Sequence, residues 1–189
     1  MRPIGLALLL VMAALTGCSG GTTADPAPAP QTQTPSQAPS QAQTAAVAPP
    51  VAGCEFYQAA DAKAVLNAVL RPAKLTDNEP GKTDTKFISC VYWTADDQRY
   101  ANVGYRRALT TAGAADNRSQ FKNQRTPDAV AIPGLGSDAY WDTPNGQILV
   151  LVGDALLVIS TGVRDAPQAG RSRPDTEKLA TLVVSHLPG

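Results

Sequence analysis

The chain has 189 residues, of which 43% are hydrophobic, and its 16 basic residues balance its 16 acidic residues. A protein that binds nucleic acid usually carries a basic surplus, so the net charge of zero argues against a nucleic-acid partner. Three cysteines and one histidine leave few ligands for a zinc site of the Cys/His type. We therefore expect neither a metal nor a cofactor.

The N-terminus has the pattern of an export signal. Arg2 is followed by an apolar run over 4–15 that only Gly5 interrupts, and small residues come next. A basic residue, a short apolar stretch and small residues before a cleavage point are typical of a secretory signal. Because a membrane-spanning helix needs about 20 apolar residues, we predict a signal peptide over 1–17 rather than a permanent transmembrane helix.

The end of this run, Leu15-Thr16-Gly17-Cys18, resembles the lipobox of bacterial lipoproteins. The resemblance implies that the Cys18 thiol receives a diacylglycerol carrying fatty acids such as palmitate, and that cleavage occurs just before it. Two acyl chains are sufficient for stable anchoring. We therefore expect an extracytoplasmic protein held to a bacterial membrane by lipid. The alternative is ordinary cleavage and secretion, with Cys18 incidental.

A change in composition divides the remaining chain. Residues 22–50 use only Thr, Ala, Asp, Pro, Gln, Ser and one Val, with a single charge at Asp25. Such a segment cannot bury enough apolar surface to offset its ordering entropy. We predict a disordered tether over 18–52, followed by a single globular domain over 53–189, which is a common domain size.

Hydrophobic spacing predicts the elements of this domain. Apolar residues over 62–70 follow helical spacing, and Pro72 ends that pattern. The polar stretch 72–86 is expected to be a loop. Further on we expect two strands, over 87–93 and 100–107, joined as a hairpin. A weak helix around Phe121 is expected over 114–125, and a short strand or extended segment over 129–132.

The last third predicts three strands and a final helix. The strands cover 139–141, 147–152 and 155–161, and apolar residues near 179–187 mark the helix, with Ser172 and Asp175 resembling a capping box. Both alternating sets of residues are apolar in 147–152 and 155–161. These strands should therefore lie centrally, covered on both sides or covered on one side with a binding surface on the other. We predict an α+β fold with an antiparallel sheet of about five strands and two or three packed helices.

Cys54 and Cys90 are the two cysteines of the domain. An even pair in an exported domain predicts a disulfide. The alternative is two separate buried thiols.

Together these features resemble a known group of proteins. A lipobox, a low-complexity tether, Cys54 before the first helix, Cys90 close to Trp93 on a strand, and Gly134-Leu135-Gly136-Ser137-Asp138-Ala139 before a strand pair look like the small secreted lipoprotein domains of unknown function common in actinobacteria. The resemblance implies an exported, lipid-anchored domain. That group has no established catalytic residues, so none can be transferred to this chain.

Two patterns that suggest chemistry have simpler explanations. Gly134 to Ala139 fits the dinucleotide fingerprint G-x-G-x-x-A, but Pro133 precedes it and a strand, not a helix, follows, so a tight turn is expected. His186 is the single candidate general base of its type. Because the predicted domain over 53–189 has no G-x-S-x-G motif, we expect a structural histidine and no catalytic residues.

Four aromatic residues on the predicted strands are candidates for ligand contact, since binding sites favour them: Tyr100, Tyr105, Tyr140 and Trp141. The alternative is that these rings belong to the core. We place the candidate ligand-binding surface on the sheet face or rim near Tyr105 and Trp141. The sequence thus favours a non-catalytic envelope protein that binds a small ligand or an envelope protein. The alternatives are an envelope hydrolase with an unrecognised site, and a structural or regulatory lipoprotein without a small ligand.

Overall fold

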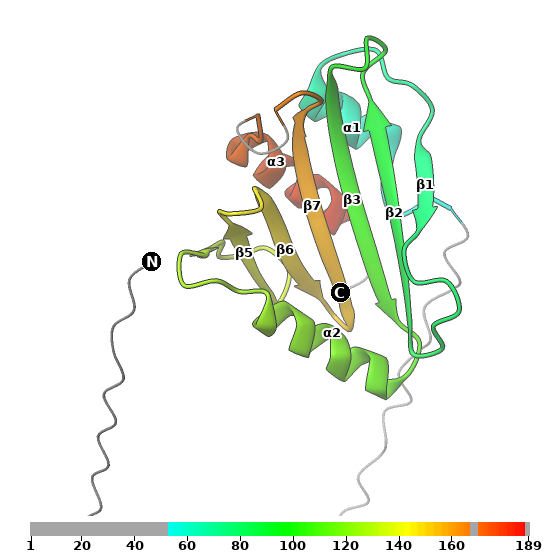
Figure 1. The fold of residues 1–189 in the computed structure, drawn as a ribbon, viewed down its shortest axis with the longest axis vertical. Coiled ribbons are helices and arrows are strands. Elements are labelled where there is room, and N and C mark those ends of the chain that lie inside the picture. Colours follow the sequence, from blue (N-terminus) through cyan, green and yellow to red (C-terminus); the bar gives the residue numbers. More distant parts are fainter. Residues whose placement is uncertain (1–52, 167–169, 188–189) are drawn as a thin grey trace, which may run out of the picture. The chain divides into compact units, whose positions relative to one another are not determined.

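A computed structural model describes residues 53–166 and 170–187. Within these residues three helices pack on one seven-stranded antiparallel sheet (Figure 1). The elements in chain order are α1 (Ala59–Leu66), β1 (Lys74–Asp77), β2 (Thr85–Trp93), β3 (Arg99–Ala108), α2 (Thr111–Asn123), β4 (Val130–Ala131), β5 (Asp138–Asp142), β6 (Gln147–Val152), β7 (Ala155–Val163) and α3 (Arg173–Ser185). The predicted signal peptide, the tether and Cys18 lie outside the described residues.

The sheet has the strand order β1-β2-β3-β7-β6-β5-β4. The predicted α+β class is confirmed, but the sheet is larger than the expected five strands. The difference includes β1, which lies in the stretch 72–86 that we expected to be a loop. Lys74 to Thr76 are all exposed, and this edge strand is held by backbone pairing to β2. It therefore has no apolar alternation from which a strand could be predicted.

Helix α1 begins and ends earlier than its apolar pattern suggests. Asn67 adopts the left-handed conformation, with φ of 46°, and this ends the helix after Leu66. Val69 is 75% exposed, while Leu70 forms an isolated bridge with Thr94. The apolar residues beyond position 66 therefore continue the helical spacing by coincidence. The other two helices lie where predicted, and the Ser172 side chain caps α3 by accepting from the Asp175 amide.

The two sides of the sheet differ in what covers them. Helices α1 and α3 pack on one side, here called the helix face, and α2 crosses the other side, here called the open face (Figure 1). On β6, Ile148 and Val150 belong to the main core on the helix face, whereas Leu149 and Leu151 join Phe121 on the open face. The prediction that β6 and β7 are central is confirmed. Strand β6 is covered on both sides, whereas Val158 and Ser160 of β7 lie on the part of the open face beyond α2.

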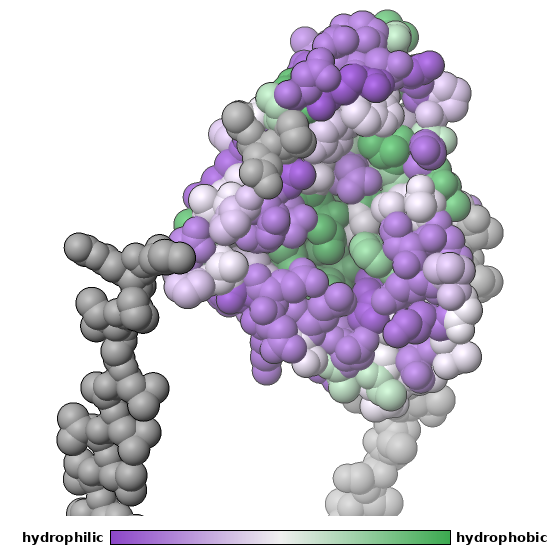
Figure 2. Space-filling view, viewed as in Figure 1, coloured by the Kyte–Doolittle hydropathy of each residue, from purple (hydrophilic) through white to green (hydrophobic). Residues whose placement is uncertain are grey.

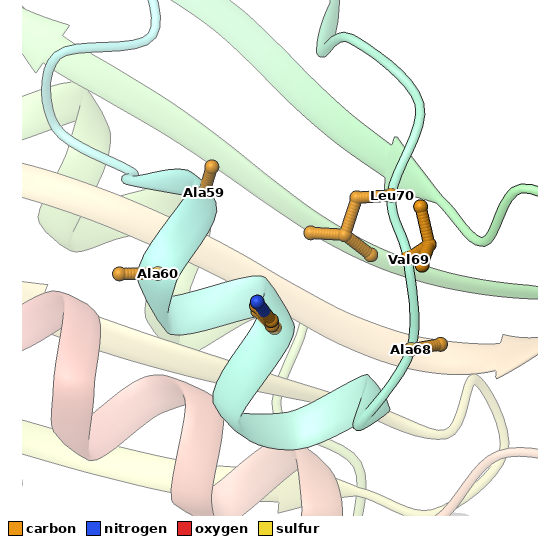
Figure 3. A pocket seen from close by; sticks show the side chains of 6 residues that line it. Ala59, Ala60, Ala68, Val69 and Leu70 are labelled. Carbon is orange, nitrogen blue, oxygen red and sulfur yellow. The ribbon is translucent and has the colours of Figure 1, made fainter.

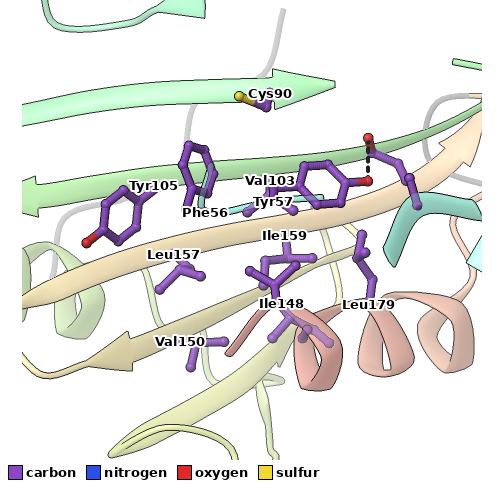
Figure 4. Close-up of a cluster of buried hydrophobic side chains, with 14 of the residues drawn as sticks. Phe56, Tyr57, Cys90, Val103, Tyr105, Ile148, Val150, Leu157, Ile159 and Leu179 are labelled. Carbon is purple, nitrogen blue, oxygen red and sulfur yellow. Dashed lines mark hydrogen bonds between the residues drawn. The ribbon is translucent and has the colours of Figure 1, made fainter. Parts of the chain in front are cut away.

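The predicted disulfide is present. Cys54 is bonded to Cys90 in β2, with their Cα atoms 5.9 Å apart. The residues that follow Cys54 hold this segment on the helix face: the Phe56 ring stacks on Tyr105 at 5.0 Å, and the Tyr57 hydroxyl donates to the Ala101 carbonyl at 3.2 Å (Figure 4). The N-terminal segment of the domain is thus fixed to the middle of the sheet.

Candidate functional site

Helix α2 covers only one end of the open face. Strand pairing places the side chains of paired residues on the same side of the sheet, and this identifies the rest of that face. The part beyond α2, here called the open platform, consists of Ser89, Val91, Tyr100, Asn102, Val158 and Ser160. Five of these are half-buried, and Ser160 is 8% exposed. Figure 2 views this face and shows hydrophobic residues at the bottom of a central hollow, bordered by hydrophilic ones.

Two glycines let aromatic side chains lie directly against the strand backbone on the open face. A Cβ atom on Gly162 would lie 2.8–2.9 Å from the Tyr100 ring and hydroxyl, and one on Gly104 would lie 2.8 Å from the Phe87 ring. Both distances are too short for a real contact, so each aromatic ring rests directly on a strand backbone. Glycine within a strand often marks such a close approach. The surface therefore carries aromatic rings without tall side chains beneath them.

A polar pair lies between these two aromatic positions. Asn102 of β3 is directly opposite Ser160 of β7. Within the described part of the chain, neither side chain forms a hydrogen bond. Asn offers two donors and an acceptor, and Ser offers one donor and two acceptor lone pairs. The floor of the open platform can therefore make several hydrogen bonds to a molecule that settles on it.

The end of the open platform farthest from α2 is an aromatic and ionic rim. Trp93 and Tyr100 lie with their ring centroids 5.1 Å apart, and the Arg164 guanidinium carbon lies 4.8 Å from the Trp93 ring centroid. Arg164 also forms an ion pair with Asp97 at 3.3 Å and donates to the Asp97 carbonyl. Asp97 also pairs with Arg71, so this one carboxylate at the rim serves two guanidinium groups.

The opposite end is fixed by a buried polar cluster that attaches α2 to the sheet. Arg106 of β3 is 3% exposed, and it donates to Glu79, Thr85, Asp116 and Asn117. Burial raises the pKa of Glu79, but hydrogen bonds from Arg106 and Thr85 outweigh it and hold that pKa below its usual value. Because α2 has few apolar residues, this cluster is a main determinant of the position of α2 on the open face.

The predicted ligand-contact residues are in the core. Tyr105 is 7% exposed and Trp141 is 8% exposed, and both belong to the main cluster on the helix face. Figure 4 shows Tyr105 in this cluster. Burial also raises the pKa of Tyr105. Neither ring contributes to the open platform. The strand register explains this, since Tyr105 pairs with Ile88 and Leu157, which face α1 and α3.

Tyr100 was among the aromatic candidates, but the rest of the open platform was not predicted from the sequence, although β3 contains a signal for it. Ala101 and Val103 alternate with Tyr100 and Asn102. Alternation of this kind predicts one core face and one wetter face. Gly104 and Gly162, both within strands, were a second signal.

The single histidine is paired with a buried carboxylate. His186 Nε2 lies 3.1 Å from Asp61 Oδ1, and the Asp61 side chain is 6% exposed. Asp61 also accepts from the Gln58 amide at the start of α1. The neighbouring Ser185 hydroxyl donates to the Leu182 carbonyl, 2.6 Å away. In this arrangement the pair joins α3 to α1.

Other candidate features are smaller. An apolar hollow of about 250 Å³ lies between α1 and the segment that follows it, lined by Ala59, Ala60, Lys63, Ala68, Val69 and Leu70 (Figure 3). Its lining has no polar group besides the Lys63 amine to orient a ligand. The turn before β5 ends at Ser137, and its Gly134 and Gly136 have positive φ values of 78° and 61°, as a tight turn requires.

Residues 53–166 and 170–187 contain no cluster of three acidic, His or Cys side chains that could hold a metal ion. They also include no helix with the length and apolar character needed to cross a membrane. No family model, curated protein or solved structure matches this chain.

Proposed function

We propose that this protein is a lipid-anchored extracytoplasmic envelope protein whose domain binds a ligand or partner through the open platform without catalysing a reaction. The observation that carries the proposal is the open platform itself. It lies on interior strands of the sheet, yet the described helices leave it uncovered. Its floor combines apolar contact with hydrogen-bonding groups that have no partner in the described residues, which is the usual composition of a binding site.

The proposed location rests on two features. Residues 15–18 resemble a lipobox, with Cys18 as the lipidated residue and 18–52 as the tether between the membrane and the domain. The Cys54–Cys90 disulfide is consistent with an oxidising compartment outside the cytoplasm. Lipid on Cys18 would hold the domain at the membrane, and the tether would let the open platform reach its ligand.

Thermal unfolding in the presence of envelope fractions tests the binding function. A ligand that binds the folded state raises the midpoint of unfolding by mass action. We expect at least one fraction to stabilise the full chain but not the Val91→Arg variant, which places a charge on the open platform. The matched control is Val130→Arg, because Val130 is on β4 and is 42% exposed. Equal stabilisation of both variants, or none of the wild type, would reject the open platform as the binding site.

An envelope hydrolase is the second candidate, and the contact between His186 and Asp61 favours it. A histidine oriented by a carboxylate is two thirds of a hydrolytic triad. A hydrolase would lose its activity in His186→Ala. The binding proposal expects that variant to keep the stabilisation by envelope fractions.

A further inference from the structure

We infer that the open platform takes a neutral saccharide, recognised by stacking on Tyr100 and by hydrogen bonds to Asn102 and Ser160. This inference rests on the proposed function and adds the chemical class of the ligand. Three observations carry it: the order of aromatic and polar groups along the strands, the neutrality of the floor, and the position of the floor on interior strands.

The first observation is an alternation of surface chemistry along β3 and β7. Tyr100 on Gly162 comes first, Asn102 opposite Ser160 comes next, and Gly104 beneath the Phe87 ring follows. Successive levels on one face are two residues apart along a strand, which is about 7 Å. A saccharide presents apolar C–H surfaces that pack on aromatic rings, and hydroxyl groups between them. A chain of sugar rings lying along the strands would match this order.

The polar pair suits hydroxyl groups in particular. A sugar hydroxyl both donates and accepts a hydrogen bond. The Asn102 amide and the Ser160 hydroxyl each do the same. Since both side chains lack a hydrogen-bond partner in the described residues, a saccharide could bind them without displacing an existing contact. Burying them under an apolar ligand would instead leave unsatisfied polar groups, which is unfavourable.

The second observation concerns charge. The floor residues are neutral, and the Arg164 guanidinium at the rim is paired with Asp97, which it shares with Arg71. Lys74 lies opposite Val91 at the outer edge of the open platform, on the exposed strand β1. A ligand with several charges would meet no countercharge on the floor, and burying an unpaired charge is unfavourable. The floor therefore favours a neutral ligand.

The third observation disfavours an extended peptide. Peptides commonly bind a sheet by adding a strand to its edge through backbone hydrogen bonds. The open platform lies on β2, β3 and β7, each of which has neighbours on both sides. Their backbone groups are occupied in the sheet, so recognition on this face must use side chains.

Isothermal titration calorimetry of the full chain tests the inference. The probes are neutral hexasaccharides of glucose, mannose, galactose and N-acetylglucosamine, with an anionic hexagalacturonate and an extended hexapeptide as comparison ligands. We expect at least one neutral hexasaccharide to bind, and Asn102→Ala or Tyr100→Ala to weaken that binding at least tenfold. Asn123→Ala is the matched control, because Asn123 is an exposed asparagine at the end of α2, and it should leave affinity unchanged.

The outcomes separate this inference from the proposed function. Thermal unfolding first checks that each variant folds, and Ser160→Ala replaces Tyr100→Ala in the comparison if the latter does not. Binding of neutral saccharides that survives these substitutions would place the site elsewhere and overturn the inference. Preference for the anionic sugar or the peptide, or no saccharide binding at all, would also overturn it. In each case the binding function is still tested separately, by the thermal unfolding of Val91→Arg in the presence of envelope fractions.

Discussion

Arg106 and Glu79 form an ion pair beneath the start of α2, with the Arg106 Nε atom 3.0 Å from both carboxylate oxygens of Glu79. The Arg106 side chain is 4% exposed and that of Glu79 is 17% exposed. The pair joins β3 to the loop before β2, and Arg106 also binds Asp116 and Asn117 of α2. Three separate parts of the chain thus depend on one guanidinium.

Arg106→Leu should therefore be strongly destabilising. Removing one member of a buried ion pair leaves its partner uncompensated and typically costs about 3–5 kcal/mol. We expect a loss of about 3 kcal/mol in the free energy of unfolding, measured by urea titration. Arg118→Leu is the control, since Arg118 pairs with Asp154 where both side chains are about half exposed, and such pairs contribute about 0–1 kcal/mol. Similar losses in both variants would contradict this reading of the cluster.

The same cluster predicts a dependence of stability on pH. Although burial raises the pKa of Glu79, donors from Arg106 and Thr85 lower it below the ordinary value of 4.5. The unfolded chain then takes up this proton at a higher pH than the folded chain. The stabilisation is complete above a pH of about 4.5 and is lost as the pH falls through the folded-state pKa. Glu79→Gln should flatten the decline of unfolding free energy between about pH 5 and 3, and an unchanged slope would count against it.

Loss of the disulfide should lower stability markedly. The bond joins residues 36 positions apart, and the chain-entropy model assigns about 4 kcal/mol to a loop of that size. The double substitution Cys54→Ser with Cys90→Ser should reduce the unfolding free energy by about that amount in urea titrations. Reductant should destabilise the wild type and leave the double variant unaffected. Two thiols that alkylate in the native oxidised protein would refute the pairing.

Lipidation is predicted to depend on Cys18 alone. Cys18→Ala should move the protein from the detergent phase to the aqueous phase in a partition assay, because the acyl chains are attached through its thiol. Ser19→Ala, next to it, should still partition with detergent. Detergent partition of the Cys18→Ala protein would mean that something other than this cysteine anchors the chain.

His186→Ala should affect folding more than function. The substitution leaves the buried Asp61 carboxylate without one partner, and a lost hydrogen bond of this kind costs about 1 kcal/mol. Lys178→Ala also removes a contact from α3 to α1, but an exposed one, to the Ala64 carbonyl. We expect it to change stability by less than about 0.5 kcal/mol. A His186→Ala protein with native stability would show that the pair contributes little to the helix contact.

Sequence patterns predicted the features that leave a local signal in the chain. The strand pair of β6 and β7, the cap of α3 at Ser172 and the disulfide were all visible because apolar runs, capping residues and paired cysteines are local signals. The edge strand β1 was missed because its exposed residues pair through backbone alone.

The position of the candidate site was not predictable in the same way. Which face Tyr105 occupies depends on its register with β2 and β7, and register is a long-range property. The position of α2 on the sheet likewise depends on Arg106, whose partners include Glu79 in the loop before β2 and Asn117 of α2 itself. A charged residue on a strand gives no local sign that it will be buried.

The disulfide also has a mechanical consequence. Any tension on the chain ahead of Gly53 reaches the domain at Cys54, and from there it passes through a covalent bond into Cys90. Cys90 lies within β2, which is hydrogen-bonded to β1 on one side and β3 on the other. Pulling is then resisted by two strand ladders at once, while α1 lies beyond the crosslink and carries no force. The force is thus applied to the sheet, and the open platform would keep its shape under a tension that would unfold a terminal helix.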